Sequence, residues 1–397
     1  MTKKKKRICA FLAAACLSSA FSGTSLLQAR AAAQKEQAVY AAFGDSIAAG
    51  YGLEGYADGQ SDAPKDSYQG LLAGFLQTQS HNYAVSGDDS NACIDILNSG
   101  KADEDLQHAD IITLSIGSND LLLPFIQIVM EYFGLEPGTI DPAAVQEQLE
   151  NGITMPQLSM SDLLKYYQQS EQLLASLEDN TILHEKAAAF PQQLETILSI
   201  LREKAPDARI YVTNIYNPFT SIPKIGEMAE VYISEINQAF SADDPDYALA
   251  DVYTPFQQEN LTNISFDANP QNLASFQPDP HPSVKGHKAI ADLLIAAVKQ
   301  DNAPKPASVI SVSSSAKKKL TVKARIPANA DGYQVRYASS KNGTYQTLAA
   351  SGNKTFQSGS GKLKTGKTYY IKLRSFRSVN GVTYYGKNSS VKKIKIK

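Results

Sequence analysis

At 397 residues the chain is longer than one ordinary domain, and its length predicts at least two folding units. Hydrophobic residues make up 43% of the sequence and charged residues 20%, a balance that excludes an intrinsically disordered chain. Residues 34–304 contain 12 Lys and Arg against 39 Asp and Glu, whereas residues 305–397 contain 20 against one. This asymmetry predicts two separately folding units with different electrostatic partners.

The first part of the chain has the pattern of a secretory signal peptide. Lys3 to Arg7 is basic, residues 8–27 are mostly small and apolar, and Ala31-Ala32-Ala33 is one of two overlapping matches to a cleavage site. We therefore expect residues 1–33 to be a signal peptide and the protein to be secreted. A retained membrane anchor is the alternative, although several serines interrupt the apolar run.

Removal of the signal peptide leaves Cys93 as the one cysteine of the mature chain. A single cysteine excludes an internal disulfide and a cysteine-based zinc site. We expect Cys93 to be a small buried side chain.

Between residues 34 and 302 the sequence alternates between strand and helix patterns. Short apolar runs that end at turn residues predict five strands, at 38–43, 82–85, 110–116, 208–215 and 248–253. Because helical stretches separate these runs, the pattern predicts βαβ units, an α/β fold and a parallel sheet.

Residues 121–205 are too long for a single crossover and predict a helical insertion. Asp141-Pro142 is typical of a helix N-cap followed by proline, and a helical repeat of apolar residues begins at Ser161. A further helix is predicted from about Ile182 to Lys204. The insertion could simply pack against the sheet, or it could form a cap that lines an acyl pocket.

The segment 303–307, which contains Pro304 and Pro306, predicts a stiff linker. Beyond it, strand-like runs alternate with turns, and Asn342-Gly343 and Asn380-Gly381 are hairpin signals. Residues 308–397 therefore predict a small all-β sandwich. The run from Gly332 to Tyr337, together with a second run at 366–370, resembles bacterial fibronectin type III-like modules.

Four separate segments carry residues that point to one site. Ser46 follows the first predicted strand at a tight turn, where its hydroxyl would be exposed and its backbone N–H would lie at a helix N-terminus, although a serine there can also be an ordinary cap. Gly87 follows the second strand, and its backbone could approach a ligand closely. Asn119 follows the third strand and offers a neutral amide donor for an oxyanion.

The fourth segment contains His281, which lies two residues after Asp279 and shortly before the last predicted helix. A histidine beside a carboxylate can accept the proton of a serine hydroxyl. Because all four segments follow strands or lie in late loops, a parallel sheet would bring them to one edge.

This ordered set resembles the SGNH/GDSL hydrolase family from about residue 38 to 297. The resemblance implies a three-layer, flavodoxin-like parallel sheet, with Ser46 as nucleophile, His281 as base, and the Ser46 N–H, Gly87 and Asn119 as the oxyanion hole. The family usually places its triad acid three residues before the histidine, where this chain has Pro278. Either Asp279 or a main-chain carbonyl is then expected to orient His281, and His287 is expected to pack or cap the last helix.

The expected function is that of a secreted lipase- or lysophospholipase-like carboxylesterase, because Leu121-Leu122-Leu123 directly follows Asn119-Asp120 and favours an acyl chain. A carbohydrate or cell-wall O-acetyl esterase is an alternative, and a catalytically inactive surface-binding protein is an alternative of another class. No metal or cofactor is expected.

The basic C-terminal module could be a solubilising spacer, or it could attach the protein to cell-wall or other anionic polymers through its lysines. Nucleic acid is not an expected partner, because the module has no recognised nucleic-acid motif and export is expected.

Overall fold

The computed structural model describes residues 38–132, 171–221, 223–265, 279–358 and 361–397. The predicted signal peptide and the predicted helix starts at Asp141 and Ser161 lie outside these residues. Cys93 is buried, as predicted.

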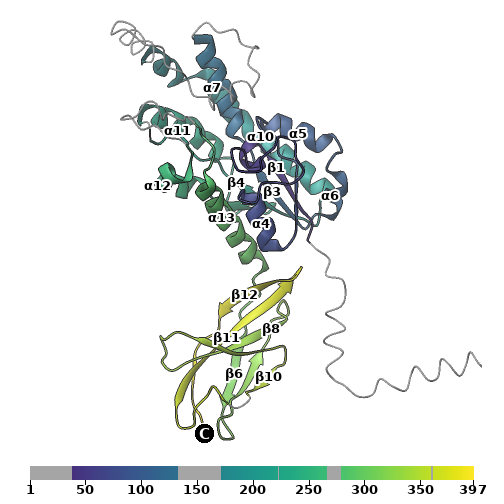
Figure 1. Ribbon diagram of the computed structural model, residues 1–397, viewed down its shortest axis with the longest axis vertical. Helices are drawn as coiled ribbons and strands as arrows, with labels where there is room; N and C mark the ends of the chain where they lie inside the picture. The colour runs from purple at the N-terminus through teal and green to yellow at the C-terminus, as the bar shows by residue number, and fades with distance from the viewer. Residues whose placement is uncertain (1–37, 133–170, 222, 266–278, 359–360) are drawn as a thin grey trace, which may run out of the picture. The chain divides into compact units, whose positions relative to one another are not determined.

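The N-terminal part of the described chain alternates between strands and helices (Figure 1). Its elements, in chain order, are β1 (Tyr40–Gly44), α3 (Ser46–Ala49), α4 (Tyr68–Leu76), β2 (Ser80–Asn82), α5 (Ser90–Asn98), α6 (Asp103–His108), β3 (Ile111–Ser115), α7 (Ser118–Tyr132), α10 (Thr181–Lys204), β4 (Arg209–Thr213), α11 (Pro223–Asn237), β5 (Tyr247–Ala250), α12 (Tyr253–Asn263) and α13 (Val284–Asn302).

The five strands form one parallel sheet in the order β2-β1-β3-β4-β5, the flavodoxin-like order, so the predicted fold class is confirmed. The second strand was placed too late, because β2 ends at Asn82. The Tyr83 and Val85 N–H groups nevertheless donate to the Ala42 and Gly44 carbonyls, so the residues just after β2 still run alongside β1. The fifth predicted strand ran too far, because Tyr253 already begins α12.

Two apolar cores cover the two faces of the sheet. Along β1, Ala41 and Phe43 pack into a core with α5, α6, α7, α10 and α11, whereas Tyr40 and Ala42 pack with α3, α4, α12 and α13. This alternation follows from the two-residue period of a strand. Figure 1 shows α4 and α13 together on one side of the strands and α5 with α10 on the other.

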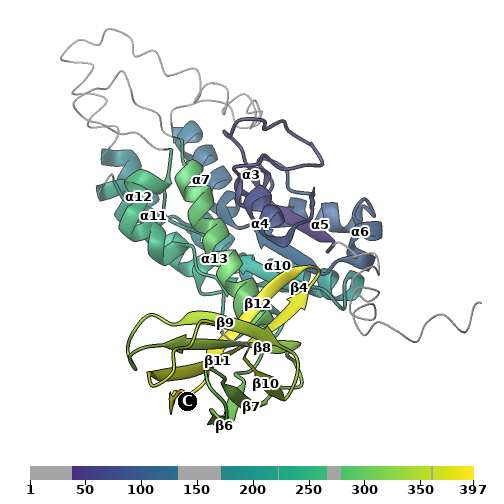
Figure 2. The ribbon, with the colours of Figure 1, turned by 60° about the horizontal axis from the view of Figure 1, so that its bottom comes forward.

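The C-terminal part is all β and follows the end of α13. Its strands are β6 (Ser308–Ser313), β7 (Thr321–Arg325), β8 (Gly332–Ala338), β9 (Gln346–Ser351), β10 (Thr355–Gln357), β11 (Thr368–Val379), β12 (Val382–Asn388) and β13 (Lys392–Lys395). One antiparallel sheet has the order β10-β7-β6 and the other β12-β11-β8-β9, with β13 paired to β11. Figure 2 shows the two sheets stacked on each other, and apolar residues from both form one core, as predicted for a sandwich.

None of the helices within the described residues combines the length and the apolarity needed to cross a bilayer.

Candidate active site

The turn after β1 presents Ser46 at the first position of α3. Gly44 has a φ of +143°, and a Cβ at this position would lie 2.0 Å from the Ser115 carbonyl oxygen, so only glycine fits here. Asp45 caps α3 by accepting the Ile47 N–H at 2.9 Å. As the first helical residue, Ser46 has an N–H without a partner inside the helix, which leaves it available to an anion.

Ser46, His281 and Asp279 form a continuous chain of hydrogen bonds. His281 Nε2 lies 2.8 Å from Ser46 Oγ, and His281 Nδ1 lies 2.6 Å from Asp279 Oδ1. The Asp279 carboxylate also accepts the His281 backbone N–H at 2.9 Å. Although burial raises the pKa of Asp279, the hydrogen bonds and the charge of His281 lower it overall, which favours the carboxylate. Of the two groups considered for orienting His281, the side chain of Asp279 is the one in contact with Nδ1.

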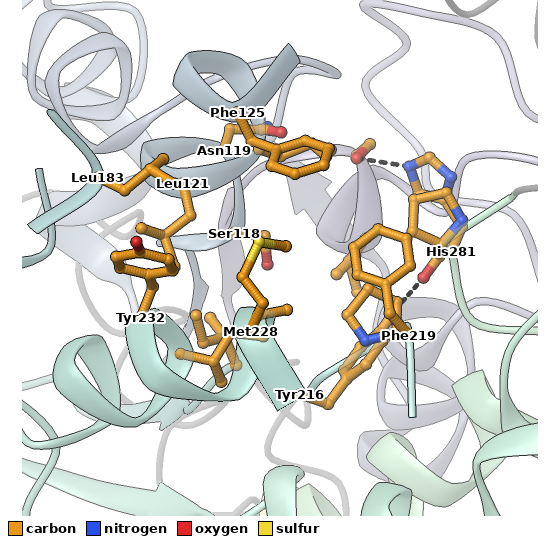
Figure 3. A pocket seen from close by; sticks show the side chains of 18 residues that line it. Ser118, Asn119, Leu121, Phe125, Leu183, Tyr216, Phe219, Met228, Tyr232 and His281 are labelled. Atoms are coloured by element: carbon orange, nitrogen blue, oxygen red, sulfur yellow. Dashed lines mark hydrogen bonds between the residues drawn. The ribbon is translucent and has the colours of Figure 1, made fainter. Parts of the chain in front are cut away.

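The loop that carries His281 is held on both sides. The His281 carbonyl accepts the Ser265 N–H at 2.8 Å, and Ile264 forms an isolated bridge with Pro282. The Tyr216 hydroxyl donates to the Pro280 carbonyl at 2.7 Å (Figure 3). Because backbone and side-chain contacts both hold the loop, the imidazole is positioned before any ligand arrives.

The two other predicted oxyanion donors follow β2 and β3, the strands on either side of β1. Asn119 is buried in the first turn of α7, and its Nδ2 donates to the Asp88 carbonyl at 2.9 Å, which uses one of its two N–H bonds and fixes the amide. Gly87 has a φ of +87° in the turn that the Asp88 N–H closes on the Val85 carbonyl. Asn119 and Ser46 line one cavity, whereas Gly87 is not among its lining residues.

Two contacts at this site were not predicted from the sequence. The Tyr51 ring packs on His281, and the buried carboxylate of Asp120 accepts hydrogen bonds from the hydroxyl and the N–H of Ser90 at the start of α5. The second contact ties α7 to α5 and thereby fixes Asn119. The run Ser118-Asn119-Asp120 predicts a turn, but it gives no sign that Asp120 pairs with the distant Ser90.

Two buried titratable groups lie close to the site. Burial raises the pKa of Asp45 to about 7, and one of its carboxylate oxygens has no partner in the described part of the chain. Burial lowers the pKa of His287 to about 3, so this ring stays neutral, and its Nδ1 accepts the Tyr68 N–H at 3.3 Å. His287 therefore packs in the core, while Ser283 caps α13.

An apolar cavity with a volume of about 90 Å³, partly open to solvent, extends from Ser46 and His281. Its walls come from α7, α10, α11 and the chain after β4, and they include Leu121, Phe125, Leu183, Phe219 and Met228. No Asp, Glu, Lys or Arg is among its described lining residues. Its apolar walls are typical of a pocket for a small apolar group or chain.

Figure 3 shows His281 at one end of this cavity and Leu183 with Tyr232 at the other. The Tyr232 hydroxyl accepts the Asn180 N–H at 2.8 Å and donates to the Leu177 carbonyl. These two bonds hold the ring of this α11 residue against the segment that precedes α10. The described part of the insertion thus packs against the sheet and also lines the cavity, which combines the two roles considered for it.

Among the described residues, no cluster of three or more His, Cys, Asp or Glu side chains could hold a metal ion.

The chain is similar to several known proteins. The model of the GDSL-like Lipase/Acylhydrolase family matches residues 42–289. The uncharacterized protein YpmR of Bacillus subtilis (strain 168) is 24% identical over 302 residues, covering 74% of this chain and 94% of YpmR.

Solved structures resemble each of the two parts. An extracellular lipase from Streptomyces rimosus shows 19% identity with a TM-score of 0.42, over 65% of this chain and 98% of the lipase. A human fibronectin type III domain shows 15% identity with a TM-score of 0.20, over 23% of this chain and 72% of that domain.

Proposed function

This chain belongs to the GDSL-like lipase/acylhydrolase family of ester-hydrolysing enzymes, and we propose that it is a lipase-like carboxylesterase that forms an acyl-serine intermediate. The observation that carries the proposal is the 2.8 Å contact between Ser46 Oγ and His281 Nε2 at the mouth of an apolar cavity. The contact supports nucleophilic catalysis, and the cavity supports an acyl chain over an acetyl group as the part of the substrate that is bound.

In the first half-reaction, Ser46 Oγ attacks the ester carbonyl while His281 Nε2 accepts the hydroxyl proton. Asp279 holds the Nδ1–H and stabilises the imidazolium. The Ser46 N–H, the Gly87 N–H and the free N–H of the Asn119 amide bind the oxyanion. His281 then returns its proton to the leaving alcohol.

In the second half-reaction, water enters from the open side of the site and gives a proton to His281 Nε2 as it attacks the acyl-serine. The oxyanion forms again in the same place, and as it collapses to release the fatty acid, His281 returns its proton to Ser46 Oγ. Throughout both halves the acyl chain lies in the cavity, between the α7 residue Leu121 and the α11 residue Met228.

The test is a series of p-nitrophenyl esters from acetate to palmitate, assayed with the wild type and with Ser46→Ala. We expect kcat/KM to rise with chain length beyond acetate and Ser46→Ala to be inactive. A strict preference for acetate would favour a carbohydrate O-acetyl esterase. Failure of wild-type Ser46 to react with a fluorophosphonate would favour an inactive surface-binding protein.

We also propose that the protein is exported, as the basic and apolar residues of segment 1–33 suggest. Fractionation of cells that express the full chain, followed by N-terminal sequencing, tests this. Mature protein that begins near residue 34 in the medium or the wall fraction is expected, and an uncleaved chain in the cytoplasm would contradict it.

For the C-terminal module we propose a role in attaching the enzyme to anionic polymers of the cell wall. The proposal is supported by the 20 Lys and Arg against one acidic residue in segment 305–397. Retention of the protein on isolated walls should then decrease as the salt concentration rises.

A further inference from the structure

Three cations lie next to one another on the outer face of the β12-β11-β8-β9 sheet. Along β11, Ile371 and Leu373 point into the sandwich core, so Lys372 and Arg374 lie on the opposite face. On β8, Arg336 stands directly opposite Lys372 in the strand register, and opposite residues share a face. We call Arg336, Lys372 and Arg374 the cationic face.

Among the residues that the structure describes, no carboxylate pairs with the cationic face. The one acidic residue in segment 308–397 is Asp331, and its carboxylate accepts the Ser378 N–H. Within the described ranges, none of the three cations forms an ion pair. Burial, and after it the charge of Arg336, lowers the pKa of Arg374. Like charges directly opposite each other destabilise a sheet, and a bound anion would relieve this repulsion.

Neutral groups hold the three cations in place. Lys372 Nζ lies 4.2 Å from the centroid of the Tyr345 ring, and Arg374 Cζ lies 4.2 Å from that of the Tyr385 ring. Arg336 donates to the Tyr345 carbonyl at 2.8 Å and to the Asn388 side chain at 3.3 Å. The charges are therefore fixed before an anion binds, which lowers the entropy lost on binding.

We propose that the cationic face is a binding site for a phosphodiester-linked polyol polymer of the cell wall. Guanidinium groups match phosphate oxygens in geometry, and three fixed cations can contact successive phosphates of a flexible chain. A single-stranded nucleic acid typically stacks its bases on aromatic faces, and here Lys372 and Arg374 lie over the Tyr345 and Tyr385 rings. The inference deepens the proposed attachment role and is independent of ester hydrolysis.

The experiment measures binding of the full-length mature protein to synthetic poly(glycerol phosphate) by titration calorimetry at several salt concentrations. The test variant is Arg336→Gln/Lys372→Gln/Arg374→Gln. The matched control is Lys317→Gln/Lys318→Gln/Lys319→Gln, which removes the same charge from an exposed turn. We expect the test variant to weaken binding more than ten-fold, and the control less than three-fold. The slope of log K against log salt should fall by on the order of 2–3 in the test variant only.

Equal weakening of binding by both triple variants would overturn the proposal and show that the diffuse charge of the module binds the polymer. Binding of single-stranded DNA or of phosphatidylserine vesicles that is as tight as, or tighter than, binding of poly(glycerol phosphate) would also overturn it. If the triple variant does not fold, the double variant Lys372→Gln/Arg374→Gln replaces it in the test, because it keeps Arg336, whose Nε is buried. Its expected loss of affinity lies between those of the two triple variants. Activity on a soluble ester should be the same in all variants, so a failure of the hydrolase assignment would be seen separately.

Discussion

The ring of Tyr51 lies against the imidazole of His281, with centroids 4.5 Å apart and planes at 42°. Tyr51 in turn receives the Tyr56 ring at 5.2 Å in an edge-on contact, and the Tyr56 hydroxyl hydrogen-bonds the Ser86 hydroxyl. An aromatic face stabilises a neighbouring cation, so Tyr51 is placed to favour the imidazolium that forms when Ser46 loses its proton.

Tyr51→Ala should therefore lower kcat by about 10-fold, the factor expected for loss of a partly buried cation–π contact. Tyr51→Phe is the matched control, because the Tyr51 hydroxyl is buried without a hydrogen-bond partner in the described chain. It should retain nearly full activity. Steady-state kinetics on one soluble ester decides the matter, and equal losses in both variants would assign the effect to the hydroxyl.

Asn119→Ala should lower kcat by about 10²–10³-fold with little change in KM, because the amide is needed only when the oxyanion develops. Asn119 also donates to the Asp88 carbonyl, so thermal melts must accompany the kinetics. A loss that appears in KM alone would show that Asn119 binds the ground state and does not stabilise the transition state.

Asp279→Asn should lower kcat by about 10³–10⁴-fold, because an amide can present the wrong partner to His281 Nδ1 and cannot stabilise the imidazolium. The contact of 2.6 Å between Asp279 Oδ1 and His281 Nδ1 is the basis for this expectation. If the loss were below about 10-fold, a main-chain carbonyl would be the better candidate for orienting the imidazole.

Tyr232→Ala should shift the preferred p-nitrophenyl ester to longer acyl chains, because Tyr232 closes the deep end of the cavity. Val231→Ala is the control, since Val231 is adjacent on α11 but exposed. The ratio of kcat/KM between palmitate and butyrate esters is the readout. An unchanged ratio in Tyr232→Ala would mean that the acyl chain does not reach this ring.

His287 should make the folded state sensitive to acid. Its pKa is about 3 in the folded protein, against 6.5 for an ordinary imidazole, so between these values the unfolded chain binds a proton that the folded chain does not. The stabilisation is fully present above about pH 6.5 and is lost as the pH falls toward 3. The associated slope is at most about 1.4 kcal/mol per pH unit.

In His287→Gln this dependence should disappear. Urea unfolding at several pH values from 7.5 to 4.5 measures it, and the difference between wild type and variant removes the opposite contribution of Asp45, whose pKa burial raises. A difference that does not vary with pH would show that His287 is also protonated in the folded chain.

The sequence predicted the order of the elements and the groups at the strand ends, because both follow from local patterns. Ser46, Asn119 and His281 each follow a strand or precede a helix, and a parallel sheet brings such positions to one edge. The boundaries of the second strand were wrong, since the polar run Ser80–Asn82 has no apolar signal and pairs only because β1 lies beside it.

The remaining features depend on contacts between distant residues. Whether Asp279 reaches His281 depends on the local path of the loop, which Tyr216 holds from 64 positions away. The Tyr51 ring contact and the Tyr232 end wall likewise join segments that no periodicity relates.

Ser46 and His281 stand 235 positions apart, and the imidazole is supplied by a loop that precedes the last helix of the α/β part. Because synthesis runs from the N-terminus, a growing polypeptide contains the Ser46 hydroxyl long before it contains the His281 imidazole that activates it. Ester hydrolysis can start only when nearly all of this part has been made, so a prematurely terminated product that lacks the loop has a nucleophile without its base.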